Sequence, residues 1–303
     1  MTTTKIAIIG AGAVGATTAY ALILRNIVAE VTLIDLDETR CEGEILDLSD
    51  ALSFSTTSKI KQGNIKDAKD AKIIIICAGT RQKPGQKREE LLKINKRIIQ
   101  SIIKELHPTS PNSILIMVTN PVDIMTYYAQ QASLLPKNQV FGTGTFLDTQ
   151  RIRRILAKKL QVADQAVHAY TLGEHGDSQF VAWSSTLIAG KPLLQFPGMN
   201  KKTLESFLCE ARGKAYEIIK CKGATYFGIA TCISAICESI LFDKKYVLPL
   251  STYIKKFDIC ISLPTVLGTK GIEKIIEPSL DAEEQQLLQA SIEKIKNYTT
   301  KAP

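Results

Sequence analysis

The chain has 303 residues and a formal net charge of +8, with 45% hydrophobic and 22% charged residues. This composition excludes disordered and collagen-like chains, and the length accommodates two domains. Apolar runs such as residues 73–78 are far shorter than the ~20 residues that cross a bilayer. The opening residues also lack the pattern of a secretory signal, so we expect a cytoplasmic protein with no membrane partner.

The charged residues also narrow the class of partner. Basic side chains are dispersed and interleaved with acidic ones, which favours an anionic small substrate over nucleic acid.

The seven cysteines are odd in number and form no C-x-x-C pair. We therefore expect reduced, buried thiols rather than disulfides, and no metal site.

Short apolar runs alternate with amphipathic segments through the first half of the chain. The pattern predicts strands at 5–10, 30–35, 71–79 and 113–120, and helices at 13–25, 85–106 and 122–133. Strands that alternate with helices are typical of a parallel sheet covered on both faces. The fold class expected for this half is therefore α/β, with a doubly wound parallel sheet.

The second half has a different pattern, which predicts an α+β domain. Helices are expected at 147–160, 201–219, 224–240 and 281–296, and strands at 166–172, 247–254, 259–267 and 272–276. Asp281 is a candidate N-cap of the last helix, with Glu284 as its capping-box partner. We place the two domains at residues 1–143 and 144–303.

A glycine motif directly follows the first expected strand and opens the first helix. Gly10 allows a tight turn, Gly12 lets a pyrophosphate approach the backbone, and Gly15 lets helix and strand pack closely. Asp35, at the end of the second strand, can accept hydrogen bonds from ribose hydroxyls and would repel a 2′-phosphate. The context favours a Rossmann-type NAD site over a purely structural turn. Arg40, five residues after Asp35, could instead accompany the 2′-phosphate of NADP, or it is an exposed arginine with no role in binding.

A second group of residues has the chemistry of an acid–base site. His175 lies in an expected loop, and Asp148 and Arg151 are three residues apart on one helix face. A carboxylate can orient an imidazole, and an arginine can clamp a substrate carboxylate. The alternatives are a structural histidine and an ordinary helix N-cap at Asp148.

Two further segments follow expected strands at the edge where doubly wound sheets bind ligands. Residues 79–88 are polar and cationic, and they predict either a solvated loop or a lid that brings Arg88 onto the ligand. Residues 119–123 carry the sequence TNPVD at the end of the next strand.

Seven motifs in register resemble the L-lactate/malate dehydrogenase family: GAGAVG, LID, AGTRQKPGQKR, TNPVDIMTY, GTGTFLDTQRIRR, HAYTLGEHGDS and KGATYFGIA. The resemblance covers residues 5–299 and is greatest to bacterial-type L-lactate dehydrogenases. It implies NAD as the cofactor and reversible hydride transfer between NADH and pyruvate.

The resemblance also assigns catalytic roles. His175 would exchange the proton with the substrate oxygen, Asp148 would orient it and raise its pKa, and Arg88 would stabilise charge on that oxygen. Arg151 would hold the substrate carboxylate, and Asn120 would hydrogen-bond the substrate.

Further positions would complete the substrate and cofactor sites. Thr225 would line the substrate pocket, and Gln82 would face the variable end of the substrate, where malate enzymes usually have arginine. Arg81, immediately before it, leaves a register shift open. The expected cofactor-binding residues are Gly10, Gly12, Val14, Gly15, Asp35, Arg40, Gly79, Thr80, Asn120 and Ile229.

Two alternatives and one regulatory hypothesis stay open. The rivals are a malate dehydrogenase or broader 2-oxo-acid reductase, and a non-catalytic NAD-binding protein. The family implies a homo-oligomer, for which we favour a tetramer. Arg153 and His168 match positions that hold fructose 1,6-bisphosphate between subunits in activated bacterial relatives, or are ordinary interface residues.

Overall fold

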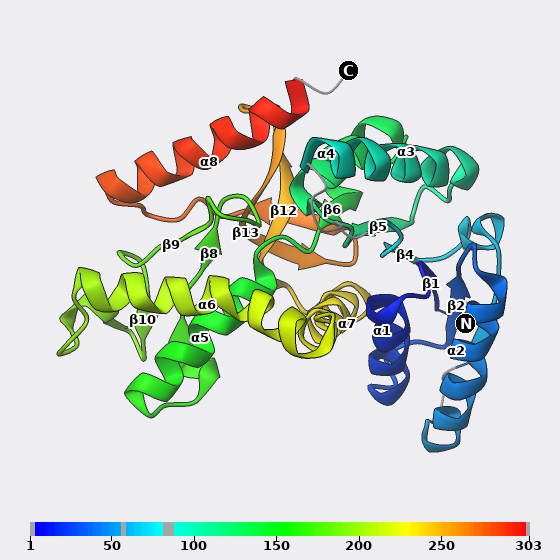
Figure 1. Cartoon of the computed structure of the whole chain (residues 1–303), viewed down its shortest axis with the longest axis horizontal. Coiled ribbons are helices and arrows are strands. Elements are labelled where there is room, and N and C mark those ends of the chain that lie inside the picture. The colour runs from blue at the N-terminus through cyan, green and yellow to red at the C-terminus, as the bar shows by residue number, and fades with distance from the viewer. Residues whose placement is uncertain (1–3, 56–58, 81–87, 301–303) are drawn as a thin grey trace.

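A computed structural model of the chain describes residues 4–55, 59–80 and 88–300. Six strands form the sheet of the first half: β1 (Lys5–Ile9), β2 (Glu30–Ile34), β3 (Lys59–Gln62), β4 (Ile73–Ile76), β5 (Ile114–Met117) and β6 (Val140–Gly142). All six pair in parallel in the order β6-β5-β4-β1-β2-β3. The expected doubly wound parallel sheet is therefore confirmed (Figure 1).

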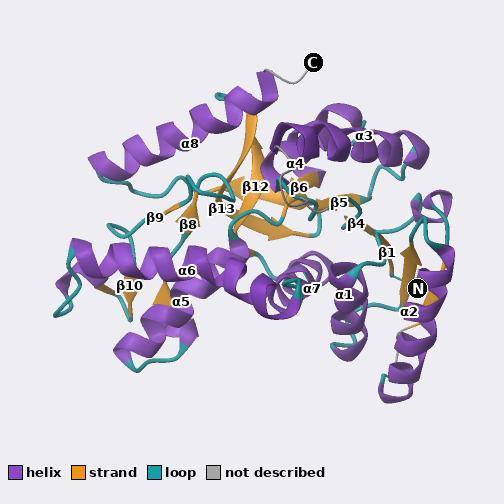
Figure 2. Ribbon diagram, viewed as in Figure 1, coloured by secondary structure: helices purple, strands orange, loops and turns teal. Residues whose placement is uncertain are grey.

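Helices cover both faces of this sheet because successive strand residues point to opposite sides. Ile6 and Ile8 pack into a core under α1 (Ala13–Leu24), α2 (Glu38–Ala51) and α7 (Phe227–Leu241). Ala7 and Ile9 pack on the other side, under α3 (Arg88–Leu106) and α4 (Val122–Ala132). Figure 2 shows the strands between these two helical layers.

The second half adds three antiparallel strands to the same sheet. They are β12 (Tyr246–Ile254), β13 (Ile259–Gly268) and β14 (Gly271–Ile275), and β12 joins β6 where Ser251 pairs with Gly142. The result is one nine-stranded mixed sheet. A continuous sheet holds groups from both halves of the chain in fixed relative positions.

The rest of the second half packs beside this sheet. It contains α5 (Phe146–Leu160), α6 (Lys201–Lys222), α8 (Ala282–Thr300) and five two-residue strands: β7 (Val167–His168), β8 (Thr171–Leu172), β9 (Phe180–Val181), β10 (Leu187–Ile188) and β11 (Lys191–Pro192). Ile292 and Ile295 of α8 pack on Ile259 and Ile261 of β13. Asp281 and Glu284 exchange the hydrogen bonds of the expected capping box at the start of α8.

Several expectations from the sequence need correction. The strand expected at 166–172 is broken into β7 and β8, which belong to different small sheets. The helix α2 and the strand β3 were not predicted, because their apolar residues show no clear periodic spacing. Only Cys41 and Leu48 of α2 are buried, and β3 is an exposed edge strand. All seven cysteines are free thiols, but Cys209 and Cys221 are exposed and Cys77 is only half-buried.

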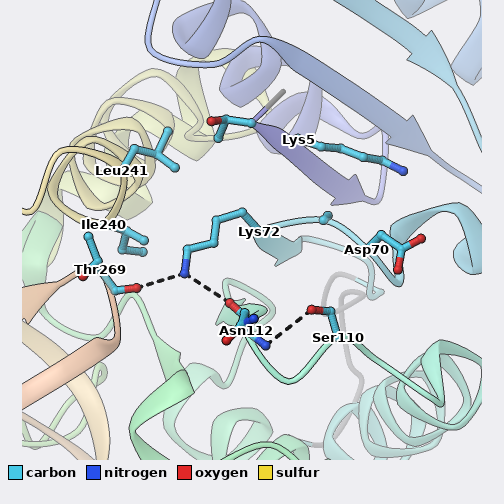
Figure 3. A pocket seen from close by; sticks show the side chains of 10 residues that line it. Lys5, Asp70, Lys72, Ser110, Asn112, Ile240, Leu241 and Thr269 are labelled. Carbon is cyan, nitrogen blue, oxygen red and sulfur yellow. Dashed lines mark hydrogen bonds between the residues drawn. The ribbon is translucent and has the colours of Figure 1, made fainter. Parts of the chain in front are cut away.

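A cavity of about 320 Å³ lies at the amino ends of β1 and β4, at the edge of the sheet opposite the glycine motif. Inside it the Lys72 ammonium donates hydrogen bonds to the carbonyl oxygens of Asn112, at 3.2 Å, and Thr269, at 3.0 Å (Figure 3). Thr269 lies between β13 and β14, so this side chain joins the two halves of the chain. Burial lowers the pKa of Lys72.

Within the described residues, no single helix is long and apolar enough to span a membrane, although α6 and α7 meet the length and composition test as a bent pair.

Candidate functional site

The glycine motif turns the chain sharply from β1 into α1. Gly10 has φ +109°, and a Cβ there would lie 2.6 Å from the Ala78 nitrogen, so only glycine fits. A Cβ at Gly15 would lie 1.8 Å from the Gly10 carbonyl oxygen, whereas one at Gly12 would meet nothing within 4 Å. Gly10 and Gly15 are therefore required by packing, while Gly12 leaves open space at the helix start.

This open space fits a phosphate group. Gly12 is the N-cap of α1 and has no side chain with which to cap the first turn. The first backbone N–H groups of a helix are hydrogen-bond donors at the positive end of its dipole, which attracts anions. The glycine motif thus has the geometry that a dinucleotide needs.

Asp35 lies beside the same loop. Its Oδ2 atom accepts a 2.6 Å hydrogen bond from the Ala11 nitrogen, and its Oδ1 atom accepts one from Asp37 at 3.0 Å. These bonds fix a carboxylate next to the glycine motif, as a ribose-binding group requires. Arg40 contacts Glu44 on the next turn of α2, at 4.0 Å, with half of its side chain exposed.

The loops that follow β4 and β5 are tied together by a residue that the sequence analysis missed. Asn95 of α3 is fully buried, accepts from the Thr80 nitrogen at 2.8 Å, and donates to the Thr80 and Asn120 carbonyl oxygens. A Cβ at Gly79 would collide with Thr119. The expected ligand-binding residues Gly79, Thr80 and Asn120 are thus brought together, and Thr80 and Asn120 are exposed. In the sequence, Asn95 is marked only as a polar residue within an amphipathic helical segment.

His175, Asp148 and Arg151 form one hydrogen-bonded cluster. Asp148 is 2% exposed. Its Oδ2 atom lies 2.6 Å from His175 Nδ1, and its Oδ1 atom accepts from Arg151 Nη1 at 3.0 Å. Asp148 lies within the first turn of α5, whose N-cap is Thr145, so the N-cap alternative for Asp148 is wrong.

This arrangement favours the charged forms of both acid and base. Burial lowers the pKa of His175, but the carboxylates of Asp148 and Asp123 together oppose burial, and the pKa lies above its ordinary value. Burial would raise the pKa of Asp148, but His175 and Arg151 hold it below its usual range. The cluster therefore favours the imidazolium form of His175.

A cavity of about 280 Å³ opens over this cluster. Its lining includes Asn120, Asp148, Arg151 and His175, which join the end of β5 to α5 and to the loop after β8. Residues of α6 also line it, namely Arg212, Ala215 and Tyr216, which the sequence analysis missed because that helix carries no motif. The cavity brings the His175 imidazole together with Arg151 and Arg212, a combination that suits a small carboxylate substrate.

The His175 loop is anchored to α8. The Glu174 nitrogen donates to Ser291 Oγ at 2.6 Å, and the Glu174 carboxylate accepts from Ser178 and pairs with Lys294 at 2.8 Å. These bonds fix the loop on both sides of His175.

The remaining expected residues have mixed placements. Val14 and Ile229 are half-buried and pack against the same core. Thr225 lies in the loop between α6 and α7; neither it nor Ile229 is among the described residues that line the cavity. Gln82 and Arg81 lie outside the described residues, as does the side chain of Arg88.

The two expected effector-binding residues lie close together. Arg153 Nε donates to the carbonyl oxygen of Ala169 at 3.1 Å, and its guanidinium lies 5.2 Å from the centre of the Tyr170 ring. His168 is exposed on β7 and directly precedes Ala169.

Comparisons with known proteins agree with this geometry. Residues 4–142 match the family model of the lactate/malate dehydrogenase NAD binding domain, and residues 145–302 match that of its alpha/beta C-terminal domain. L-lactate dehydrogenase A of Rhizopus oryzae is 43% identical over 302 residues, which cover 99% of this chain and 94% of that protein. L-lactate dehydrogenase of Lacticaseibacillus casei is 40% identical, over 98% of this chain and 94% of that protein.

Solved structures give the same result. The minor L-lactate dehydrogenase from Enterococcus mundtii aligns with a TM-score of 0.96 and 36% identity, over all of this chain and 99% of that one. A lactate dehydrogenase from a deep-sea metagenome of the Medee basin aligns with a TM-score of 0.95 and 36% identity, over 99% of both chains.

A matched pair of substitutions separates cofactor binding from packing. Gly12→Ala should weaken NADH binding at least tenfold, because the new methyl group enters the space left for phosphate, while stability stays within about 1 kcal/mol. Gly15→Ala should lower stability by ~1–3 kcal/mol, because its methyl group collides with backbone. NADH titration and thermal unfolding measure the two effects. Unchanged NADH affinity in Gly12→Ala would contradict the assignment.

Proposed function

We propose that this chain, which belongs to the lactate/malate dehydrogenase family, is an NAD-dependent L-lactate dehydrogenase that reversibly reduces pyruvate to L-lactate. The observation that carries the proposal is the hydrogen-bonded cluster of His175, Asp148 and Arg151 in one cavity. The same chain has a glycine motif with open space at the start of its first helix. Relatives named L-lactate dehydrogenase over nearly the full length of the chain support the same activity.

The cluster contains the groups that the protein needs for proton transfer and for binding the substrate carboxylate. NADH, when bound, supplies the hydride that adds to the carbonyl carbon of the substrate. His175, held through Nδ1 by Asp148, gives the proton on Nε2 to the carbonyl oxygen, so that one hydride and one proton convert the ketone into the alcohol. Arg151 keeps guanidinium nitrogens free of Asp148 and binds the substrate carboxylate.

Arg88 and Gln82 complete the proposed site. Arg88 begins α3, directly after residues 81–87. There it would stabilise negative charge on the substrate oxygen, which is worth ~3–4 kcal/mol in comparable sites. Gln82 would face the substrate methyl group, where a neutral amide leaves a second carboxylate unpaired and so disfavours oxaloacetate.

We propose that the two halves of the chain have different roles. Residues 1–143 would bind the cofactor, through Gly10, Gly12, Val14, Gly15, Asp35, Arg40, Gly79, Thr80, Asn120 and Ile229, the last contributed by α7. Residues 144–303 would supply the substrate-binding and proton-transfer groups, with Thr225 at the pocket edge. We propose a cytoplasmic homotetramer as the working form.

Replacing the proton donor should separate catalysis from binding. His175→Asn should bind NADH with unchanged affinity but reduce pyruvate ~10²–10⁴-fold more slowly, because the general acid is lost. The measurement is NADH absorbance under saturating pyruvate, with a fluorescence titration of NADH as the control. Turnover like that of the wild type would remove His175 from the mechanism, and full binding without any wild-type turnover would favour a non-catalytic NAD-binding protein.

A second substitution distinguishes lactate from malate chemistry. Gln82→Arg should raise the ratio of kcat/KM for oxaloacetate over pyruvate by orders of magnitude, because it places a cation opposite the second carboxylate. Arg81→Gln serves as the matched control and should leave the ratio near its wild-type value. The reverse result would mean that Arg81 faces the substrate.

Regulation by fructose 1,6-bisphosphate is the last part of the proposal. Arg153 reaches the backbone next to exposed His168, so both side chains belong to one surface. Two copies related by a two-fold axis would repel each other until a bisphosphate neutralised them, with a coupling of typically ~1–3 kcal/mol.

Pyruvate saturation curves with and without millimolar fructose 1,6-bisphosphate, at low protein concentration, test this proposal. We expect a lower KM and more tetramer with the effector, and loss of both effects in the double variant Arg153→Gln, His168→Gln. Activation that survives the double substitution would place the site elsewhere, and unchanged curves would leave the two residues as ordinary interface positions.

A further inference from the structure

A second carboxylate contacts His175, at the backbone rather than at the ring that Asp148 binds. Asp123 lies in the first turn of α4 and is 2% exposed. Its Oδ2 atom accepts a 2.7 Å hydrogen bond from the backbone nitrogen of His175. Asp148 binds the imidazole ring at the same time. His175 is therefore held by one carboxylate at its ring and by another at its backbone.

The element that carries Asp123 also carries one edge of the cavity. Asn120 and Pro121 line the cavity and directly precede α4. The bond from Asp123 to His175 thus joins the end of β5, in the first half of the chain, to the loop after β8, in the second half. It holds the His175 backbone against the helix that directly follows Asn120 and Pro121.

The negative charge of Asp123 is costly where it lies. Its Oδ1 atom has no hydrogen bond of good geometry among the residues that the structure describes. Burial raises the pKa of Asp123 to about 6, against the opposing effects of the Ser251 hydroxyl and of the His175 backbone and ring. An asparagine would accept the same backbone hydrogen bond without burying a charge. The charge of Asp123 also raises the pKa of the neighbouring His175 imidazole.

We propose that Asp123 is a positioning residue of this active site, one that fixes the His175 backbone against α4 and whose charge, together with that of Asp148, favours the imidazolium. This inference rests on the proposed dehydrogenase function only for its consequence in turnover. The electrostatic effect on His175 is a property of the folded chain.

The other groups around the pair are few. Arg151 of α5 opposes the imidazolium, while Asp148 and Asp123 favour it. Glu174, beside His175, raises the pKa of Asp123. Cys260 of β13 is buried, and burial raises the pKa of its thiol well above the ordinary value; the charge of Asp123 raises that pKa further. The thiol is therefore neutral at physiological pH.

The test compares Asp123→Asn with a matched control, Glu284→Gln. Glu284 is also buried and accepts a backbone hydrogen bond, from Ser184 at 2.9 Å, but that bond lies at the start of α8. The first readout is the NMR titration of the His175 imidazole, and the second is the pH at which kcat/KM for pyruvate falls by half.

We expect both midpoints to move to lower pH by at least half a unit in Asp123→Asn, and to stay at the wild-type value in Glu284→Gln. A purely structural role would lower activity without moving either midpoint, and that result would overturn the proposal. If the wild type does not reduce pyruvate, the proposed function fails, while the imidazole titration still decides the role of Asp123.

A stability measurement follows from the same charge. Because the pKa of Asp123 is raised from 3.8 to about 6 in the folded state, the stability that this group contributes at low pH is lost as pH rises from 3.8 through about 6. The Tm of Asp123→Asn relative to the wild type should therefore increase between pH 5 and pH 8. If the variant does not fold, the wild-type titration decides: the His175 resonance must show a second inflection from Asp123 near pH 6, and a single inflection would contradict the proposal.

Discussion

The site depends on one buried carboxylate, that of Asp148, placed between two cationic groups. It binds the His175 ring at 2.6 Å and Arg151 at 3.0 Å, while only 2% of the residue is exposed. A buried charge of this kind is tolerated only when its partners and hydrogen bonds offset the loss of water. Here the same bonds that make it tolerable also orient the imidazole, raise its pKa and fix the arginine that would receive a substrate carboxylate.

The nine-stranded sheet makes this arrangement possible. The glycine motif, the loops after β4 and β5, and the start of α4 all lie at the carboxyl ends of parallel strands, where a doubly wound sheet leaves room for a ligand. The pairing of β6 with β12 extends that sheet into the second half of the chain. At the amino ends of the parallel strands, the hydrogen bond from Lys72 to Thr269 also joins the two halves. Asp148 and His175 can therefore face Asn120 with little freedom to shift.

Much of this could be predicted from the sequence, because its strongest signals are local. The reasons expected for Gly10 and Gly15, a tight turn and close packing, are confirmed by the structure. The isoleucine-rich strand β4 is buried at every position, as expected for a parallel sheet covered on both faces. The break between β7 and β8, the missed helix α2 and the extension of the sheet by β12 depend on tertiary packing. Asn95, Asp123 and Arg212 were missed as site residues because their roles arise from contacts between segments distant in sequence.

The role of Asp148 is tested by the pH at which the His175 imidazole titrates, followed by NMR in the wild type and in Asp148→Asn. We expect a wild-type midpoint above the ordinary value of 6.5 and a clear fall in the variant, because burial then acts without the Asp148 carboxylate that opposes it. A wild-type midpoint at or below 6.5, or equal midpoints in the two proteins, would contradict the claim that Asp148 maintains the proton donor.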